Sequence, residues 1–302
     1  MGKRLVAFIF FANYFVGLLA VALSLETVIQ LNLPFNSIPY YLLLASATVF
    51  YYTFAYAVPT GTTISDNPRT RWYQEHYRFA KRSQRVLLAV CIALAGWLLL
   101  SNFVRLITLP LSYWLLALLI PAAAILYYGL LPRSLIAFNL RNTGWLKAFV
   151  IGLVWAGCVS LFPVIMLKVE RNVAVHEPLL LFWLFVKNWM FCTVNAIMFD
   201  IKDYKDDSNI ELKTFAVRFG LHKTIYYILI PLLVIGMLSL FAFGFYRHFH
   251  PYRILFNLIP FVCLLLVAFS LQRPRSILFY LIVIDGLLLV KAACGIVASV
   301  LI

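Results

Sequence analysis

The sequence predicts an all-α membrane protein, a polytopic bundle of nine transmembrane helices. Of its 302 residues, 64% are hydrophobic and only 12% are charged. Soluble proteins average roughly half apolar and about a quarter charged residues, so this composition argues against a soluble enzyme, a disordered chain or a secreted disulfide scaffold. The apolar residues also fall into separate stretches, and basic residues are concentrated in alternate loops between them.

Each apolar stretch has about twenty residues, the length that a helix needs to cross the hydrocarbon core. No long linker, low-complexity tract or internal repeat separates the stretches, so residues 1–302 are expected to form a single integral membrane domain. Proline within several stretches is compatible with kinked membrane helices. The predicted spans run near residues 5–25, 39–58, 85–104, 109–130, 146–167, 179–199, 224–245, 254–272 and 276–300.

The loops between these spans alternate in charge, and the formal net charge is +14. Because cytoplasmic loops are enriched in Lys and Arg, the pattern predicts a cell-membrane protein with a cytoplasmic N-terminus and an external C-terminus. Loops 59–84 and 200–223 are then cytoplasmic, and the basic excess indicates orientation rather than nucleic-acid binding. On the predicted cytoplasmic side lie 18 of the 25 basic residues: Lys3, Arg4, Arg69, Arg71, Arg78, Lys81, Arg82, Arg85, Arg133, Arg141, Lys147, Lys202, Lys205, Lys213, Arg218, Lys223, Arg273 and Arg275.

An acidic cluster follows the sixth span, on the side that otherwise carries the positive charge. Asp200, Asp203 and Asp207 are spaced i, i+3 and i+7, so they share one face if the helix continues past the membrane surface. Carboxylates this close repel one another unless a cation lies between them, and carboxylate oxygens suit Mg²⁺, which completes its shell with phosphate oxygens and water. The cluster therefore indicates a cytoplasmic Mg²⁺–diphosphate site. The alternative is a solvated acidic loop balanced by neighbouring bases, namely Lys202, Lys205 and Lys213.

The string Asp200-x-x-Asp203-x-x-x-Asp207, with Thr214 seven residues later and then Phe219-Gly220, resembles the second aspartate-rich motif of the UbiA-type intramembrane prenyltransferases. This resemblance implies a nine-helix bundle, a Mg²⁺ cofactor bound by the three aspartates, and a diphosphate bound with the help of Thr214. It also implies transfer of a prenyl group from a polyprenyl diphosphate to an aromatic or other lipid-soluble acceptor, as in quinone or lipid biosynthesis.

Two positions depart from the family pattern. Glu211 stands where the family usually has Gly. The first motif of the family, N-D-x-x-D-x-x-x-D at the end of the second span, is degenerate, because no acid lies between Glu26 and Asp66. Asp66-Asn67-Pro68-Arg69 weakly resembles the tail of that motif, and a second Mg²⁺ would have to use Asp66 or Glu75 or bind without these ligands. The chain is therefore either an enzyme with altered metal chemistry or a relative that keeps the fold without turnover.

Basic residues of loop two are candidates for holding a diphosphate, since Arg binds phosphate oxygens in bidentate fashion. We name Arg69, Arg71 and Arg78 as substrate-binding candidates. The alternative for each is ordinary positive-inside charge in contact with anionic membrane lipids.

Polar residues inside the spans are further candidates, because ionisable groups at membrane depth are costly and are often functional. On the sixth span, Asn188 and Asn195 share a stripe that leads toward the acidic cluster, and Lys187 beside them is a candidate for a substrate headgroup. Interhelical hydrogen bonding is the alternative for the asparagines. Asp285 and Lys291 lie in the last span, where Asp285 is expected roughly mid-membrane, and the role of each stays open.

The sequence thus favours a Mg²⁺-dependent intramembrane prenyltransferase. One alternative is a non-catalytic UbiA-like protein that binds an isoprenoid or lipid. A secondary transporter that uses Lys187, Asp285 and Lys291 is a weaker alternative, because no internal repeat is present. The acceptor, the prenyl chain length and the oligomeric state are left open by the sequence.

Overall fold

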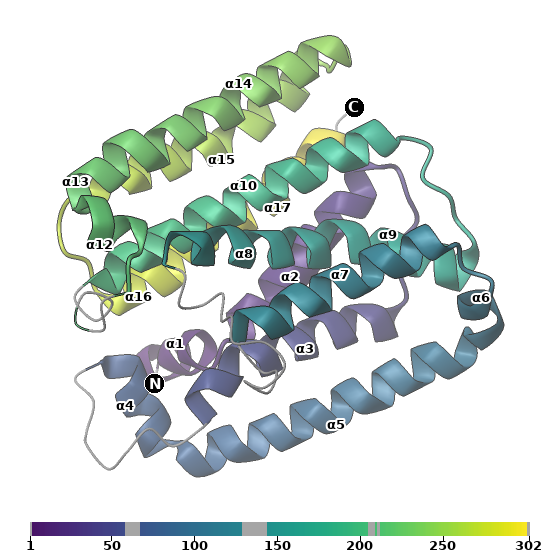
Figure 1. Cartoon of the computed structure of the whole chain (residues 1–302), viewed down its shortest axis with the longest axis horizontal. Helices are drawn as coiled ribbons and strands as arrows, with labels where there is room; N and C mark the ends of the chain where they lie inside the picture. Colours follow the sequence, from purple (N-terminus) through teal and green to yellow (C-terminus); the bar gives the residue numbers. More distant parts are fainter. Residues whose placement is uncertain (1, 58–66, 129–143, 205–208, 210–211, 301–302) are drawn as a thin grey trace.

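The computed structural model describes residues 2–57, 67–128, 144–204, 209 and 212–300, and the regular structure of these residues is entirely helical. Figure 1 shows a bundle in which α2, α8, α10 and α17 lie centrally, α5 runs along one side and α14 with α15 along the other. The helices are α1 (Gly2–Phe11), α2 (Tyr14–Gln30), α3 (Ile38–Ala57), α4 (Pro68–Glu75), α5 (Tyr77–Ser101), α6 (Phe103–Ile107), α7 (Leu111–Tyr128), α8 (Trp145–Ala156), η2 (Gly157–Leu161), α9 (Phe162–Arg171), α10 (Pro178–Lys202), α12 (Phe215–Phe219), α13 (Leu221–Thr224), η3 (Ile225–Leu229), α14 (Ile230–Tyr246), α15 (Pro251–Ser270), α16 (Ile277–Phe279), η4 (Tyr280–Ile284) and α17 (Asp285–Val300).

Six continuous helices in the described part of the chain are long and apolar enough to cross a membrane. Shorter apolar helices lie among them, at Tyr14–Gln30 and Leu111–Ile125, and α3 is apolar over 20 residues. The all-helical membrane fold is confirmed, whereas the count of nine spans and the orientation of the termini stay predictions. The six helices are Tyr77–Ser101, Trp145–Arg171, Pro178–Lys202, Leu221–Tyr246, Pro251–Ser270 and Ile277–Val300.

The predicted first span, residues 5–25, is wrong in its bounds. The helix breaks after Phe11, because Asn13 adopts a left-handed conformation with φ 64°, and α2 then continues to Gln30. Tertiary contacts hold this break: the Asn13 amide donates to the Thr53 hydroxyl at 3.2 Å and to the Tyr73 hydroxyl at 3.3 Å. These partners are distant in sequence, so hydropathy alone does not reveal the break.

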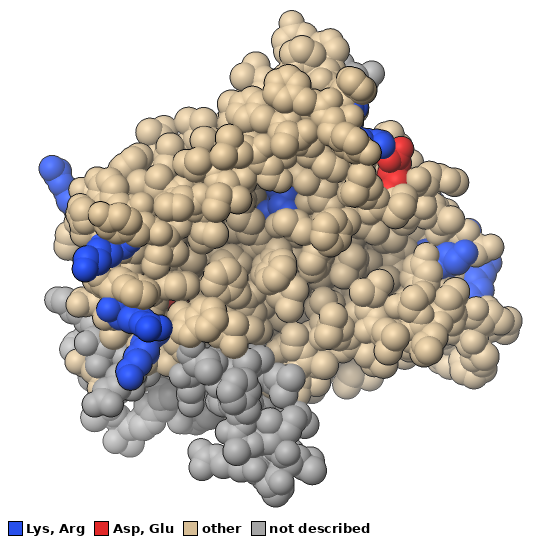
Figure 2. Space-filling view, turned by 45° about the horizontal axis from the view of Figure 1, so that its top comes forward, with Lys and Arg blue, Asp and Glu red and all other residues tan. Residues whose placement is uncertain are grey.

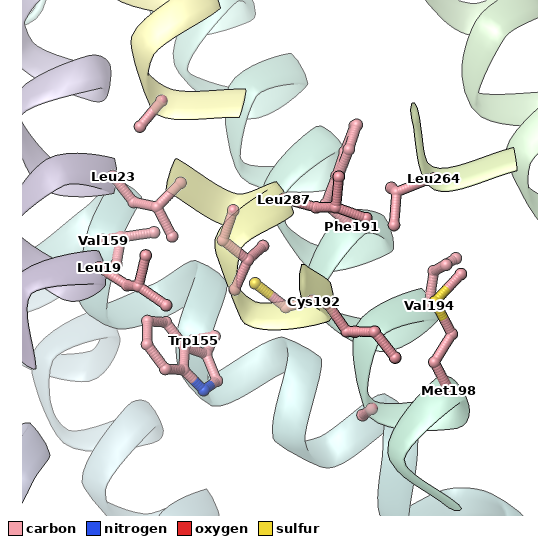
Figure 3. Close-up of a cluster of buried hydrophobic side chains, with 14 of the residues drawn as sticks. Leu19, Leu23, Trp155, Val159, Phe191, Cys192, Val194, Met198, Leu264 and Leu287 are labelled. Carbon is pink, nitrogen blue, oxygen red and sulfur yellow. The ribbon is translucent and has the colours of Figure 1, made fainter. Parts of the chain in front are cut away.

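The buried core is formed where α2, α8, α10 and α17 meet. Figure 3 shows side chains from these four helices converging, among them Leu23, Trp155, Phe191 and Leu287. The close approach of α8 to α10 depends on Gly152, because a Cβ there would overlap Thr193 and the backbone of α10. Small residues allow this kind of close helix contact in membrane proteins, where packing is a main source of association free energy.

The outer helices present apolar side chains outward. Leu100 on α5 is 79% exposed, and Leu238 on α14 is 62% exposed. In the view of Figure 2 most of the surface is uncharged, and Lys and Arg lie mainly toward its margins. An apolar girdle with charge at its edges is the surface that a hydrocarbon core requires.

Candidate active site at the end of α10

The last turn of α10 carries two of the predicted acids. Asp200 is 2% exposed, and its Oδ1 lies 2.8 Å from the Nζ of Lys147. Asp203 follows the helix as its C-cap residue, and its Oδ1 lies 2.5 Å from the Nζ of Lys202. The two carboxylates are one helical turn apart, and each has an ammonium group beside it. Asp207 lies outside the described residues.

Lys147 reaches this site from the first turn of α8. The tight contact between α8 and α10 at Gly152 brings the starting turn of α8 beside the last turn of α10. Sequence reasoning counted Lys147 only as part of the basic charge at the cytoplasmic side. The available signal was its position, since it is a lysine only two residues into a helix that follows a basic loop.

Asp285 lies on the same side of the bundle as the last turns of α10, where it contacts Asn195. The Asn195 amide donates to Oδ1 of Asp285 at 3.5 Å. Asp285 begins α17 directly after the π-helical turn η4, which places it opposite α10. Asn195 was predicted as a site residue, whereas the partner of Asp285 was left open. The structure identifies that partner as Asn195.

Arg69 is buried in the described structure, and its guanidinium group contacts protein groups. Its Nε and Nη2 each donate to the carbonyl oxygen of Phe11 at 3.3 Å, and Nη2 also donates to Oδ1 of Asn13. The guanidinium carbon lies 4.6 Å from the ring centroid of Tyr56. Burial raises the pKa of the neighbouring Tyr73 hydroxyl, and the Arg69 charge opposes this shift. Arg69 therefore stabilises the break between α1 and α2.

The remaining predicted basic and polar residues take different places. Arg71 and Arg78 are exposed on α4 and α5. The Thr214 hydroxyl accepts from the backbone N–H of Val217 at 3.4 Å and so caps α12. The Asn188 amide donates to the Ser160 hydroxyl at 2.8 Å, which is the interhelical hydrogen bond that the sequence offered as an alternative.

Lys187 lies in a second, separate cluster. Its Nζ is 2.8 Å from Oδ1 of Asn257 and 3.4 Å from Oε1 of Glu26, while the Nζ of Lys291 is 2.5 Å from Oε2 of Glu26. Gln30 also donates to Glu26, at 2.8 Å. Lys187 precedes Asp200 by thirteen residues on α10, which is about 20 Å at the helical rise. The cluster therefore ties α2, α10, α15 and α17 together at a distance from the acids.

Tyrosines occupy the end of α3. Trp155 Nε1 donates to the Tyr52 hydroxyl at 2.5 Å, and the Tyr51 hydroxyl donates to the carbonyl oxygen of Ala124 at 3.2 Å. Both tyrosines line a cavity of about 420 Å³ between α2, α3, α7 and α8. The cavity is bounded by Ala20, Tyr40, Leu43, Leu44, Ala47, Thr48, Tyr51, Tyr52, Ala124, Ile151, Val154, Trp155, Cys158 and Phe162.

The family model of the UbiA prenyltransferase family matches residues 65–280, which include α10, the acids and most of the bundle. The chain belongs to the UbiA prenyltransferase family. The resemblance drawn from the aspartate-rich motif is thereby confirmed. Comparison with curated protein sequences gives no match.

Solved structures of a UbiA homologue from Archaeoglobus fulgidus share the fold of this UbiA family member. One has a TM-score of 0.53 at 16% identity, with 96% of this chain and 99% of that chain covered. A structure of that homologue bound to DMAPP and Mg²⁺ has a TM-score of 0.51 at 16% identity, with 97% of each chain covered. A third, bound to Cd²⁺, has a TM-score of 0.52 at 16% identity, with 96% and 99% covered.

The residues at the end of α10 fit a hard divalent cation. Mg²⁺ takes oxygen ligands and is usually held by one or two carboxylates plus substrate phosphates. Asp200 and Asp203 supply such oxygens, and the ammonium groups of Lys147 and Lys202 stand where a cation would be expected. Within the described residues no group of three His, Cys, Asp or Glu side chains is gathered closely enough to hold a metal by itself.

Proposed function

We propose that this UbiA family member is an intramembrane prenyltransferase that moves a prenyl group from a polyprenyl diphosphate to an aromatic or other lipid-soluble acceptor. One juxtaposition carries the proposal. The Lys147–Asp200 pair lies at the start of α8, and Ile151, one turn further along α8, already lines the apolar cavity. A charged diphosphate and an apolar chain of the same molecule thus find suitable surroundings next to each other.

The basic residues would act on the leaving group. As the bond between the prenyl C1 and the diphosphate oxygen breaks, the electron pair leaves with the diphosphate, whose charge is stabilised by Lys147 and Lys202. Mg²⁺, held by Asp200, Asp203 and Asp207, would supply further positive charge to the diphosphate. Arg71 and Arg78, which are exposed, remain candidates for additional substrate contacts. Arg69 and Thr214 would have to exchange the protein contacts described above for contacts with the substrate.

The cavity residues would act on the other product of this cleavage. The prenyl group is left as an allylic cation, and the ring faces of Tyr51, Tyr52 and Trp155 at the near end of the cavity can stabilise it through cation–π attraction. A carbon of the acceptor then bonds to the prenyl C1 and releases a proton. In the predicted orientation, the diphosphate departs toward the cytoplasmic side.

The test is prenyl transfer by the purified, reconstituted protein from labelled prenyl diphosphates, with and without Mg²⁺, against a panel of aromatic acceptors. Replacing both acids (Asp200→Asn with Asp203→Asn) is expected to reduce turnover by at least 100-fold, a loss typical of removing a main source of transition-state charge stabilisation. Glu177→Gln is the matched control, because Glu177 pairs with Arg247 away from this site. Normal turnover by the double variant would contradict the assignment of the site.

A non-catalytic, isoprenoid-binding family member is the second candidate. The absence of acid from α3 favours it, since Tyr51 and Tyr52 stand at the end of that helix and are bonded to protein groups. Stoichiometric binding of a prenyl diphosphate without turnover, across a broad acceptor panel, would support this candidate over the enzyme.

A further inference from the structure

The apolar cavity has a near end and a far end relative to Asp200. On α8 and its continuation, Ile151 lies one turn from Lys147, whereas Phe162 is the last lining residue along the same path. On α3, Tyr52 is bonded to Trp155, and Tyr40 lies twelve residues away, about 18 Å at the helical rise. The cavity is therefore elongated along the helices and leads away from the charged site.

Two aromatic side chains, Tyr40 and Phe162, stand at the far end. Tyr40 is 5% exposed, and its ring centroid lies 5.4 Å from that of Tyr41. Tyr40 belongs to the buried core, and Ala20 of α2 lines the same cavity. Phe162 begins α9 directly after the π-helical turn η2 and packs against the same core. These two rings therefore bound the end of the cavity that lies farthest from Lys147 along α8 and α9.

We propose that Tyr40 and Phe162 form the floor of a prenyl-chain pocket and set the longest prenyl chain that the protein accepts. This inference rests on the proposed prenyl transfer function and goes one step further, to its donor specificity. With the diphosphate beside Asp200 and Lys147, a chain that runs along α3 reaches this floor after a fixed length. A longer chain must displace one of these two rings. Well-packed sites resist such insertion, and discrimination of about 10–200-fold per added apolar group is typical of enzyme pockets.

The lining of α3 offers variants that change the depth of the pocket in opposite directions. Ala47 is a small residue between the two ends, on the same stripe as Leu43 and Leu44. Ala47→Phe is expected to shorten the pocket, and Tyr40→Ala is expected to lengthen it. Tyr40→Phe keeps the ring and removes only the hydroxyl, so it serves as the matched control. Ala47→Leu is a milder form of the shortening variant, for use if Ala47→Phe fails to fold.

The experiment measures binding of labelled geranyl, farnesyl and geranylgeranyl diphosphates to the reconstituted full-length protein, with Mg²⁺ and without acceptor, so that turnover is not needed. We expect Ala47→Phe to weaken the binding of the longest bound donor at least tenfold, while the affinity for the shortest donor changes less than threefold. Tyr40→Ala should instead tighten binding of the next longer donor at least tenfold, and Tyr40→Phe should retain the wild-type order.

The experiment distinguishes failure of the pocket floor from failure of the proposed function. If the wild type binds these donors and the order is the same in all folded variants, the pocket floor is wrong and the proposed function stands. An equal loss of binding for all donors in Ala47→Phe would likewise overturn the floor, because a floor that limits chain length must separate short from long donors. If the wild type binds no prenyl diphosphate, the proposed function fails, and the inference that rests on it fails as well.

Discussion

At the residue scale, Glu26 is a buried carboxylate that lies between two buried lysines. It is 1% exposed, and its two carboxylate oxygens lie beside the ammonium groups of Lys187 and Lys291. Charge at membrane depth is costly unless it is paired and hydrogen-bonded. One carboxylate shared by two lysines therefore stabilises residues that would otherwise oppose the association of α2, α10 and α17.

Glu26→Gln is expected to destabilise the protein by about 3–5 kcal/mol, because it leaves two buried ammonium groups without a counter-charge. The measurement is the thermal or denaturant midpoint in detergent. Glu177→Gln is again the control, since its ion pair with Arg247 is partly exposed and is worth at most about 1 kcal/mol. Combining Glu26→Gln with Lys291→Met should recover part of the loss. Equal midpoints for Glu26→Gln and the wild type would show that the cluster does not hold the helices together.

At the scale of elements, the pairing of α8 with α10 is what assembles the charged site. Asp200 belongs to α10 and Lys147 to α8, and the two meet because Gly152 lets the helices approach closely. The same pairing orients the cavity-lining face of α8 toward α3. The site therefore depends on one interhelical distance as much as on its charged groups.

Gly152→Ala is expected to lower stability by about 1–3 kcal/mol, the usual cost of overpacking, although alanine is the better helix former. Binding of prenyl diphosphate should weaken as well, because Lys147 moves relative to Asp200. Gly96→Ala on α5 is the matched control, since a Cβ there meets nothing within 4 Å. That variant should be neutral or more stable by up to about 1 kcal/mol. The same thermal midpoint for both variants would refute the close-contact role of Gly152.

At the scale of the whole molecule, the surface and the charge distribution define how the bundle lies in a membrane. Apolar side chains face outward on α5 and α14, and charge is concentrated toward the margins of the face in Figure 2. The positive-inside pattern adds a direction, since loops 59–84 and 200–223 carry much of the basic charge. The proposed site would then open to the cytoplasm.

Orientation can be measured with single cysteines introduced into a variant whose five native cysteines are replaced. Glu75→Cys, at the end of α4, should react with an impermeant maleimide only in inside-out vesicles, and His176→Cys, between α9 and α10, only in right-side-out vesicles or intact cells. Both positions are exposed in the structure. The reverse labelling pattern would invert the predicted topology, and labelling of both from one side would change the number of spans between them.

The sequence by itself determined the membrane class, most of the helix positions and the family. These follow from local information: the length of apolar stretches, and the spacing of Asp200, Asp203 and Thr214 within one segment. The family model over residues 65–280 confirms the last of these. Asp207, although part of the motif, lies outside the described residues.

Only the tertiary structure decided which charged groups are partners. Lys147 and Asp200 are 53 residues apart, and Glu26 and Lys291 are 265 apart, so no local pattern connects them. The break at Asn13 and the contacts of Arg69 likewise depend on neighbours brought in by folding. Hydropathy indicates which segments leave water, because the free energy of transfer from water is close to a sum over the individual residues. Pairing of buried charge is decided only when the helices pack, because the interaction between two charges depends on the distance that packing sets.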